Sequence, residues 1–333
     1  MSVPVSVRPS LDPAVAEVRL AVRRALEGFA GTTVVVALSG GPDSLALAAA
    51  TAFEAPKLDI RAVAATIDHG LQERSADAAA AASRHARAMG LDALVVRVDV
   101  GSAGGPEASA RDARYRALAE VARERSASAV LLGHTLDDQA ETVLLGLARG
   151  SGAASLMGMA PERADDSGRW VRPLLAVRRA TTVAACAGAG LEPWHDPHNE
   201  DARFTRVRVR EAVLPVLERE LGPGIAEALA RTAEQLREDA EAFAEMIDET
   251  IEDIVEHAEA GISVSAAALA ANSAALRHRI IRLVVSSEFG QSLSRAQTLE
   301  VARLATDWSG QGPLDLPGCS VRRVGGRLEF TAA

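Results

Sequence analysis

Short runs of apolar and β-branched residues alternate with long alanine-rich segments in the first part of this chain. The short runs predict strands, and the alanine-rich segments between them predict helices. The strands that we expect span residues 34–38, 60–67, 94–100 and 129–133. Strands that alternate with helices form a parallel sheet with helices packed on its faces. We therefore predict an α/β fold with a doubly wound, mainly parallel sheet.

The chain is long enough for two domains. Its 333 residues, of which 48% are hydrophobic, can bury a core in each domain. The net charge of -9 argues against a protein that coats nucleic acid or an acidic membrane through its overall charge, although a local basic patch is compatible with it. We find neither a signal-like N-terminus nor an apolar run of about 18 residues, so we expect a cytoplasmic protein that does not bind membranes.

The second part of the chain has a helical pattern. Apolar residues recur at helical spacing through one long segment, whose other face is acidic. They are Leu229, Leu236, Phe243, Ile247, Ile251 and Ile254. Further helices are expected near residues 273–288 and 295–308, and Gly325-Gly326 between alternating residues predicts a terminal hairpin. Because Pro215 and nearby glycines interrupt the pattern, we place one domain at 1–215 and a second, mostly helical domain at 216–333.

A loop rich in glycine and serine follows the first expected strand and leads into a helix. It consists of Ser39, Gly40, Gly41, Pro42, Asp43 and Ser44. Small residues at such a junction leave backbone N–H groups free to bind an anion, and the helix dipole adds positive potential. The loop lacks the lysine of a Walker loop and the glycine spacing of a dinucleotide-binding fold. These residues alone leave two explanations open, a phosphate site and a tight turn that Ser39 or Asp43 caps.

Polar motifs also follow the second and fourth expected strands, where the ligands of parallel sheets bind. They are Asp68-His69-Gly70-Leu71 and residues 134–142. Together with the loop, these motifs resemble those of the N-type ATP pyrophosphatases, the PP-loop superfamily, and within it those of the tRNA(Ile)-lysidine synthetases. The further matching pieces are Glu107 with Arg111 and Arg114-Tyr115, residues 149–152, residues 172–175, and Trp194 to Asp196 with Asn199. The resemblance covers roughly the first 215 residues and implies an adenine nucleotide alpha hydrolase-like fold there.

The resemblance implies a two-step ligation on an isoleucine tRNA that carries a CAU anticodon. ATP would adenylate the C2 carbonyl oxygen of the wobble cytidine and release pyrophosphate. The amine of L-lysine would then attack C2 and expel AMP, which gives lysidine. ATP, L-lysine and this tRNA are the ligands that the resemblance implies, and Mg²⁺ is expected with ATP.

The resemblance places ATP at the loop and at the end of the second strand. The ATP-binding residues are then Ser39, Gly40, Gly41, Pro42, Asp43, Ser44, Asp68 and His69. Pyrophosphate needs hydrogen-bond donors that are already in position, and loop amides and hydroxyls supply them. A carboxylate beside that anion is unfavourable unless it caps the helix, binds a metal or holds a cation. A Mg²⁺ ion on Asp43 or Asp138 would reconcile these charges.

The catalytic residues that we predict are Asp43, Arg111, Asp137 and Glu141. Asp137 and Glu141 lie four residues apart, on one face of a helix, where they can bind the ammonium of lysine and help to remove its proton. A capping box from Asp138 to Glu141 is the structural alternative. A solvated helix face is the alternative for Arg111, but we prefer a functional role, because a guanidinium suits the negative charge of the adenylated intermediate. Arg114 is the weaker candidate. His69 and His134 are secondary site candidates.

The densest basic stretch of the chain is a predicted tRNA-binding segment. It contains Arg203, Arg206, Arg208 and Arg210, with Phe204 available to stack on a base. The alternative is a helix-end cluster whose arginines pair with Asp201 and Glu211. Val207 stands where the family usually has Asn, so the side-chain amide of that Asn is missing here. Thr135 stands where a second His is common, which argues against an essential role for that His.

Other functions are compatible with parts of this pattern. One is another PP-loop enzyme, either a tRNA-modifying or an amide-forming ATP pyrophosphatase. Cys186 and Cys319 lack paired spacing, so we expect reduced thiols rather than a zinc site, an iron–sulfur cluster or the sulfur chemistry of a thiolase. The other is a non-catalytic ATP sensor, which would not need the carboxylates and Arg111. The second domain is expected either to position the tRNA or to pack between domains or in a homodimer.

Overall fold

The computed structural model describes residues 11–70, 75–99, 106–150, 152–194, 201–258 and 261–332. Leu71, His195, Asp196 and Asn199 of the motifs above lie outside these ranges, and the side chain of Glu107 is likewise not described. The chain forms two compact units, Met1–Leu236 and Arg237–Ala333. The division falls within helix α10 (Ile225–Ile254), and the domain boundary expected after residue 215 stays a prediction.

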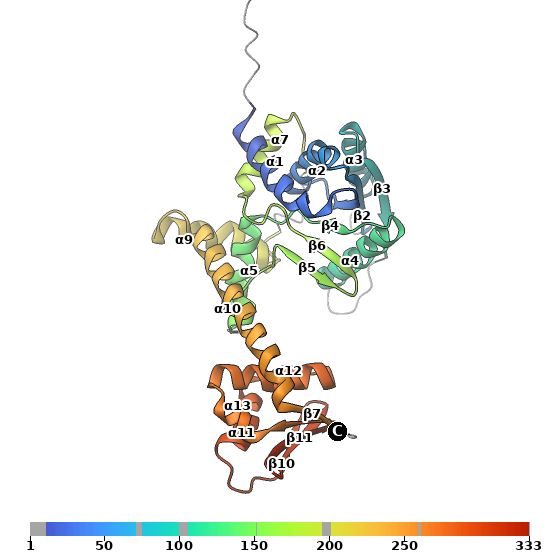
Figure 1. Cartoon of the computed structure of the whole chain (residues 1–333). Helices are drawn as coiled ribbons and strands as arrows, with labels where there is room; N and C mark the ends of the chain where they lie inside the picture. Colours follow the sequence, from blue (N-terminus) through green and yellow to red (C-terminus); the bar gives the residue numbers. More distant parts are fainter. Residues whose placement is uncertain are drawn as a thin grey trace, which may run out of the picture. The chain divides into compact units, whose positions relative to one another are not determined.

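The first unit is built on a six-stranded sheet with the order β3-β2-β1-β4-β6-β5 (Figure 1). Its strands are β1 (Thr33–Ala37), β2 (Arg61–Asp68), β3 (Asp92–Arg97), β4 (Ala129–Leu131), β5 (Glu162–Asp165) and β6 (Gly168–Val171). All neighbouring pairs are parallel except β5 with β6. The predicted mainly parallel sheet is confirmed, and so are its first four strands to within a few residues.

Helices cover both faces of this sheet. The helices of the first unit are α1 (Pro13–Leu26), α2 (Pro42–Glu54), α3 (Ser75–Ala88), α4 (Pro106–Glu124), α5 (Leu136–Ala148), α6 (Ala153–Leu156), α7 (Arg179–Gly188), α8 (Thr205–Arg208) and α9 (Leu214–Leu221). Because side chains alternate along a strand, Val34 and Val36 of β1 pack in one core with α1, α2 and α7, whereas Val35 packs in another with α4. The doubly wound arrangement is therefore confirmed.

The second unit combines helices with an antiparallel sheet. Its elements after α10 are β7 (Val255–Ala258), β8 (Gly261–Ser265), α11 (Ala266–Ala271), α12 (Ala274–Phe289), α13 (Arg295–Thr306), β9 (Leu314–Leu316), β10 (Cys319–Val324) and β11 (Arg327–Ala332). The expected long helix, the two helices after it and the terminal hairpin are all present. The hairpin turns at Gly325 and Gly326, whose φ angles of +57° and +82° suit a two-residue turn.

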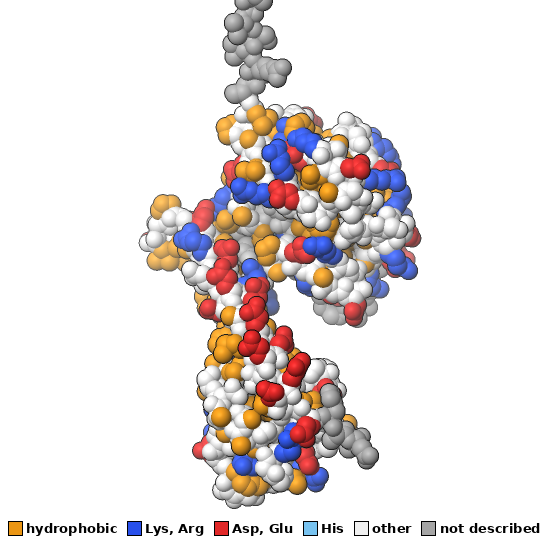
Figure 2. Space-filling model, in the orientation of Figure 1, with side chains coloured by type: hydrophobic (Ala, Val, Ile, Leu, Met, Phe, Trp, Pro, Cys, Tyr) orange, Lys and Arg blue, Asp and Glu red, His pale blue; other side chains and the backbone are white. Residues whose placement is uncertain are grey.

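The description of this unit as mostly helical is incomplete. Strands β7, β8 and β9 join the hairpin in a five-stranded sheet with the order β7-β8-β11-β10-β9. The buried residues of the sheet share one core with α10, α12 and α13. The exposed face of α10 is acidic, as predicted (Figure 2). Among the described residues, no helix is long and apolar enough to cross a membrane.

Candidate functional site

The glycine-rich loop joins β1 to α2 and holds its own hydroxyl groups in place. The Ser44 hydroxyl accepts hydrogen bonds from the amides of Ser39 (3.2 Å) and Gly40 (3.1 Å), and it donates to the carbonyl of Gly41 (3.0 Å). Gly40 has a φ of +88°, which favours glycine. Pro42 occupies the first turn of α2, and the N-cap residue is Gly41, which has no side-chain cap. The capping role considered for Ser39 or Asp43 is therefore wrong, and amides of the first turn remain to bind an anion.

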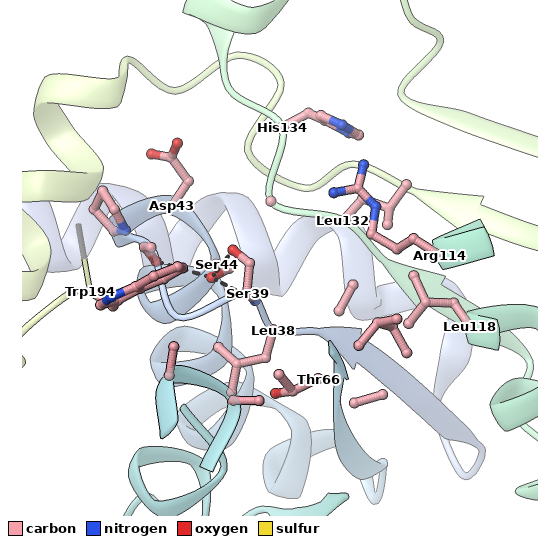
Figure 3. A pocket seen from close by; sticks show the side chains of 18 of the residues that line it. Leu38, Ser39, Asp43, Ser44, Thr66, Arg114, Leu118, Leu132, His134 and Trp194 are labelled. Atoms are coloured by element: carbon pink, nitrogen blue, oxygen red, sulfur yellow. Dashed lines mark hydrogen bonds between the residues drawn. The ribbon is translucent and has the colours of Figure 1, made fainter. Parts of the chain in front are cut away.

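A cavity of about 390 Å³ opens beside this loop (Figure 3). Ser39, Asp43 and Ser44 lie on one side of it, and Arg114 and His134 lie on the other (Figure 3). The other expected ATP contacts at its wall are Gly41, Pro42, Asp68 and His69. The cavity thus lies at the carboxyl ends of β1, β2 and β4, where ligands of parallel sheets bind.

The cavity wall carries buried polar atoms that have no hydrogen-bond partner among the described residues. They are the Thr66 hydroxyl oxygen and the Nδ1 atoms of His69 and His134. Apolar side chains surround them, including Leu38, Leu118 and Leu132 (Figure 3). A buried polar atom without a partner is costly, so a ligand that supplies hydrogen bonds would be stabilised there. An apolar slot with a few polar atoms, next to a phosphate loop, suits a nucleoside triphosphate.

The surroundings of both histidines of the cavity disfavour their charged form. Burial lowers the pKa of His69, and the charge of Arg114 lowers it further. Burial likewise lowers the pKa of His134 to about 3, and the nearby Asp138 only partly offsets this. A neutral imidazole cannot neutralise phosphate, but it can donate or accept one hydrogen bond at each nitrogen. The geometry therefore favours a hydrogen-bonding role for both residues.

Arg114, rather than Arg111, lies in the cavity wall. Arg111 is exposed; its guanidinium stacks over Tyr115 at 4.9 Å and donates to the Tyr115 hydroxyl. Arg114 forms no ion pair among the described residues. Burial lowers the pKa of Arg114, and the charge of Arg111 lowers it further. A buried cation without a counter-ion is unfavourable in the free protein, which makes Arg114 a strong candidate for an anionic ligand.

Three carboxylates converge on one arginine at the start of α7. The Arg179 guanidinium contacts Asp43 Oδ2 at 3.3 Å, Asp138 Oδ1 at 2.7 Å and Glu141 Oε1 at 3.2 Å. Burial opposes the charge of Arg179, but the three carboxylates outweigh it and raise its pKa. Asp43 also accepts a hydrogen bond from the Thr182 hydroxyl of the same helix. Arg179 thus ties the phosphate loop to α5.

Arg179 is not among the site residues predicted from the sequence. It lies about forty residues after the acidic motif that it binds, as the separation of 41 between Arg179 and Asp138 shows. The signal nearest to it is the Arg172-Pro-Leu-Leu175 piece of the family resemblance, which ends shortly before α7. No local pattern of charge or periodicity marks an arginine whose partners come from other elements.

In the acidic motif at the start of α5, Asp138 takes part in helix capping and Asp137 forms an ion pair. Thr135 is the N-cap, and its hydroxyl and amide contact Asp138 in a capping box. The predicted capping box from Asp138 to Glu141 is therefore wrong. Asp137 does not line the cavity; it accepts a hydrogen bond from the Arg179 amide (2.7 Å) and pairs with Arg178 (3.3 Å).

The pKa values of Asp43 and Asp138 shift in opposite directions. Burial raises the pKa of Asp43, although Thr182 and Arg179 stabilise its ionised form. Burial also opposes ionisation of Asp138, but the charge of Arg179 and the hydrogen bonds from Thr135 outweigh it and lower the pKa. Asp43 and Asp138 both contact the Arg179 guanidinium. A cation of the ligand that took the place of this guanidinium would therefore contact both carboxylates.

Two carboxylates of this cluster fit a magnesium ion bound with ATP. Magnesium is usually held by one or two carboxylates, several waters and substrate phosphates. Asp43 and Asp138 share the Arg179 guanidinium and both line the cavity beside the phosphate loop. No group of three or more metal-ligating side chains occurs in the part of the chain that the structure describes, so an ion held by protein groups alone is not indicated.

Two of the four predicted tRNA-binding arginines are exposed to solvent, and the other two contact the carboxylate cluster. Arg203 is exposed and pairs with Asp201 (2.7 Å), and Arg208 is exposed and donates to backbone carbonyls. Arg206 and Arg210 point instead to Glu141. The alternative of pairing with nearby acids is thus confirmed for Arg203 and Asp201. No described arginine pairs with Glu211 through an ion pair.

Neither cysteine belongs to a metal or redox pair. Both are free and buried. Cys186 donates to the carbonyl of Pro42 (3.3 Å) behind the phosphate loop, and burial raises its pKa to about 11. Cys319 lies in β10 of the second unit, and burial raises its pKa as well. The expectation of two unpaired thiols is confirmed.

Two family models match this chain. The PP-loop domain matches residues 16–217, and the TilS substrate binding domain matches residues 265–329. The solved structure of the U34-tRNA thiolase NcsA from Methanococcus maripaludis, with its [4Fe-4S] cluster, is similar with a TM-score of 0.59 and 20% identity over 68% of this chain and 80% of that one. At this identity the likeness concerns the fold alone.

Curated relatives match over nearly the whole length. The tRNA(Ile)-lysidine synthase of Leifsonia xyli subsp. xyli (strain CTCB07) is 60% identical over 302 residues, which cover 90% of each chain. The tRNA(Ile)-lysidine synthase of Thermobifida fusca (strain YX) is 52% identical over 325 residues, covering 96% of this chain and 98% of that protein. Because these relatives are more than half identical to it over nearly its whole length, and the PP-loop model matches more than half of it, this chain belongs to the tRNA(Ile)-lysidine synthase family.

Proposed function

We propose that this protein joins L-lysine to C2 of the wobble cytidine in an isoleucine tRNA with a CAU anticodon, and that it converts ATP to AMP and pyrophosphate. Relatives that cover 90% and 96% of this chain are named tRNA(Ile)-lysidine synthases. The structural observation that supports this chemistry is one cavity whose wall joins a phosphate loop to Asp138, Arg179 and Arg210. Because tRNA is the substrate, we infer that the protein works in the cytoplasm.

The loop residues would stabilise the pyrophosphate that leaves when cytidine is adenylated. The amides in the first turn of α2 have no side-chain cap, so they would bind an anion there, and the helix dipole favours negative charge at the same place. The hydroxyls of Ser39 and Ser44, 3.1 Å apart, add donors. Asp43 would hold a magnesium ion that neutralises the phosphates.

Arg114 would stabilise the negative charge of the adenylated cytidine and of departing AMP. Its guanidinium lies across the cavity from the phosphate loop and has no carboxylate partner among the described residues (Figure 3). A guanidinium binds phosphate through paired hydrogen bonds. We therefore assign to Arg114 the role that the sequence favoured for Arg111.

Glu141 and Asp138 would bind an ammonium of lysine, and Asp137 would act by positioning α7. Asp138 lines the cavity, and Glu141 shares both Arg179 and Arg210 with it. Once desolvated, a carboxylate can take the proton that the amine must lose before it attacks. Asp137 binds the first amide of α7 and so fixes the helix that carries Arg179.

AMP release tests this function. The full-length protein is incubated with labelled ATP, with lysine and with a transcript of the CAU-anticodon isoleucine tRNA, and each component is omitted in turn. We expect AMP and pyrophosphate to form only when the tRNA is present. A methionine tRNA transcript with the same anticodon is the matched control for RNA. Equal AMP formation without any tRNA would contradict the proposal.

A further inference from the structure

Trp194 is an aromatic residue in the wall of the nucleotide cavity. Among the described residues that line this cavity, it is the one tryptophan, tyrosine or phenylalanine. Its backbone amide donates a hydrogen bond to the carbonyl of Gly40 at 2.9 Å. Its Cβ atom lies 3.7 Å from the position that a Cβ atom would take at Gly40. Trp194 therefore lies next to the phosphate loop (Figure 3).

The indole of Trp194 packs on no other ring or cation among the described residues. The other two tryptophans do. Trp170 contacts Tyr115, with ring centroids 4.8 Å apart, and the Arg323 guanidinium lies 5.6 Å from the Trp308 ring. Trp194 is half-buried, and its indole N–H donates no hydrogen bond to a described residue. A flat apolar ring that is partly open to solvent in a cavity wall is suited to stack on a ligand.

The proposed reaction brings the cytosine to the same loop. The C2 carbonyl oxygen attacks the α-phosphorus of ATP, and reacting atoms start about 3 to 3.5 Å apart. The loop would bind the pyrophosphate that leaves, so the α-phosphate lies at the edge of the loop. The cytosine must then lie within a few ångströms of the loop, which is where Trp194 contacts Gly40.

The wobble base must also leave the stack of the anticodon loop. Enzymes that act on a base take it out of its stack, which costs free energy. Proteins commonly offset this cost by stacking the free base on an aromatic side chain. The sequence offered Phe204 for this role, but Phe204 does not line the cavity. Trp194 is the aromatic residue that the structure places there.

We propose that Trp194 stacks on the wobble cytosine and holds its C2 carbonyl oxygen toward the α-phosphate of ATP. This inference rests on the proposed function, because it takes the CAU-anticodon tRNA as the substrate. A neutral apolar ring fixes the plane of the base without competing with the loop for phosphate. Trp194 thus contributes orientation rather than a charge or a proton.

The adenine of ATP has a more enclosed place in the cavity. Leu38 and Leu132 of the wall are 2% and 5% exposed, and Thr66 is 3% exposed. An enclosed apolar slot with one hydroxyl suits the base of a small ligand. A half-buried residue such as Trp194 can instead be reached by a base that stays attached to a large RNA.

Intrinsic tryptophan fluorescence of the full-length protein tests this stack, because a base stacked on an indole quenches its emission. The protein is titrated with the isoleucine tRNA transcript and with the same transcript made abasic at the wobble position, both with α,β-methylene-ATP, which cannot release pyrophosphate. We expect stronger quenching by the transcript that carries the cytosine. Trp194→Phe should abolish this difference. Trp308→Phe is the matched control, since Trp308 lies in the second unit, and should retain it.

The rate of AMP formation gives a second readout. Trp194→Leu should lower kcat/KM for the tRNA by about tenfold or more, the usual effect of losing one base stack. Trp194→Phe keeps an aromatic ring and should restore most of this loss. Both variants keep the backbone hydrogen bond to Gly40, so we expect their affinity for α,β-methylene-ATP to equal that of the wild type.

The possible results separate this inference from the proposed function. Equal quenching by the cytidine and abasic transcripts, or full quenching by α,β-methylene-ATP alone, would overturn the inference in an enzyme that still forms lysidine. A Trp194→Leu variant as active as the wild type would also overturn it. Absence of lysidine in the wild type would overturn the proposed function. If Trp194→Leu fails to fold, Trp194→Phe still decides the fluorescence comparison.

Discussion

Asp43 is a loop carboxylate whose surroundings disfavour its charge. Burial raises its pKa above the ordinary value of 3.8, and the neighbouring Asp138 adds to the shift, while Thr182 and Arg179 oppose it. The folded protein therefore holds this proton more tightly than the unfolded chain does. The stabilisation that protonation gives is complete below about pH 3.8 and is lost as the pH rises through the raised pKa. At neutral pH the ionised carboxylate thus costs stability, as groups at functional sites often do.

Asp43→Asn should lower the activity of the protein without lowering its stability. The amide cannot ionise, so we expect the variant to be at least as stable as wild type at pH 7, with an advantage that grows as the pH rises above about 4. AMP formation should fall by about 100-fold or more, because the site loses a charge beside the phosphates. Thermal unfolding across this pH range and the rate of AMP formation measure the two effects. Asp92→Asn, at a carboxylate that is 46% exposed, is the control.

Arg114 and Arg111 can be compared by the same substitution. Arg114→Met should reduce AMP formation by about 100-fold, because it removes the cation at the cavity wall that lies across from the loop. It should not destabilise the fold, since it removes a partly buried cation that has no carboxylate partner among the described residues. Arg111→Met removes an exposed cation outside the cavity wall and should have a much smaller effect on the rate. A larger loss in Arg111→Met than in Arg114→Met would restore the preference based on the sequence.

Helix α5 shows how one secondary-structure element orients several site residues. Its N-cap Thr135 is fully buried and is bound to Asp138 in a capping box. The same helix carries Glu141 one turn later, toward Arg179 and Arg210. Thr135 occupies a position where the family commonly has a second His, and capping gives the threonine a structural role there.

Thr135→Ala should lower the free energy of unfolding by about 1 kcal/mol, the usual cost of removing an N-cap side chain. Thr135→Ser keeps the hydroxyl and should restore most of this loss. Chemical denaturation of both variants gives the comparison. If alanine and serine prove equally destabilising, packing of the threonine methyl group rather than capping is the dominant contribution.

The elements that the sequence predicted are those with a strong local pattern. Strands β1 to β4 and helix α10 have apolar runs or a helical period, and each was placed within a few residues. Strand β5 is exposed along its whole length, and β6 has only four residues, so neither shows the alternation that marks a strand. Strands β7, β8 and β9 have four, five and three residues, and they depend on pairing across the sheet.

The motifs that form the site could be predicted from the sequence, but the ion pairs between them could not. The phosphate loop and the acidic motif are each a continuous stretch of sequence that follows the end of a strand, so both could be predicted from the sequence. Arg179 and the inward turn of Arg206 and Arg210 depend on contacts between elements that lie far apart in the chain, such as the separation of 69 between Arg210 and Glu141. Such contacts leave no local signal.

The whole molecule is acidic, so its RNA contact depends on local basic groups. The net charge is -9, and the exposed face of α10 is acidic (Figure 2). RNA phosphates are repelled by such a face and are attracted to arginines without carboxylate partners. Arg208 is exposed, and its partners among the described residues are neutral groups, including the carbonyls of Ala202 and Arg203. It is therefore available for a phosphate.

The salt dependence of tRNA binding tests this contact. Arg208→Ala should weaken tRNA binding at low salt and reduce the slope of log affinity against log salt concentration by about 1, the effect of one lost phosphate contact. Filter binding between about 50 and 200 mM salt measures the slope. Arg219→Ala is the control. An unchanged slope in Arg208→Ala would show that this arginine does not contact RNA.

Nucleoside analysis of the reacted tRNA examines the chemistry itself. The isoleucine transcript is incubated with the protein, ATP and isotopically labelled lysine, digested to nucleosides and separated by mass. We expect the wobble cytidine to disappear and an equal amount of lysidine that carries the label to form, with one AMP for each lysine incorporated. An intact wobble cytidine, or label found on any other nucleoside, would contradict the account.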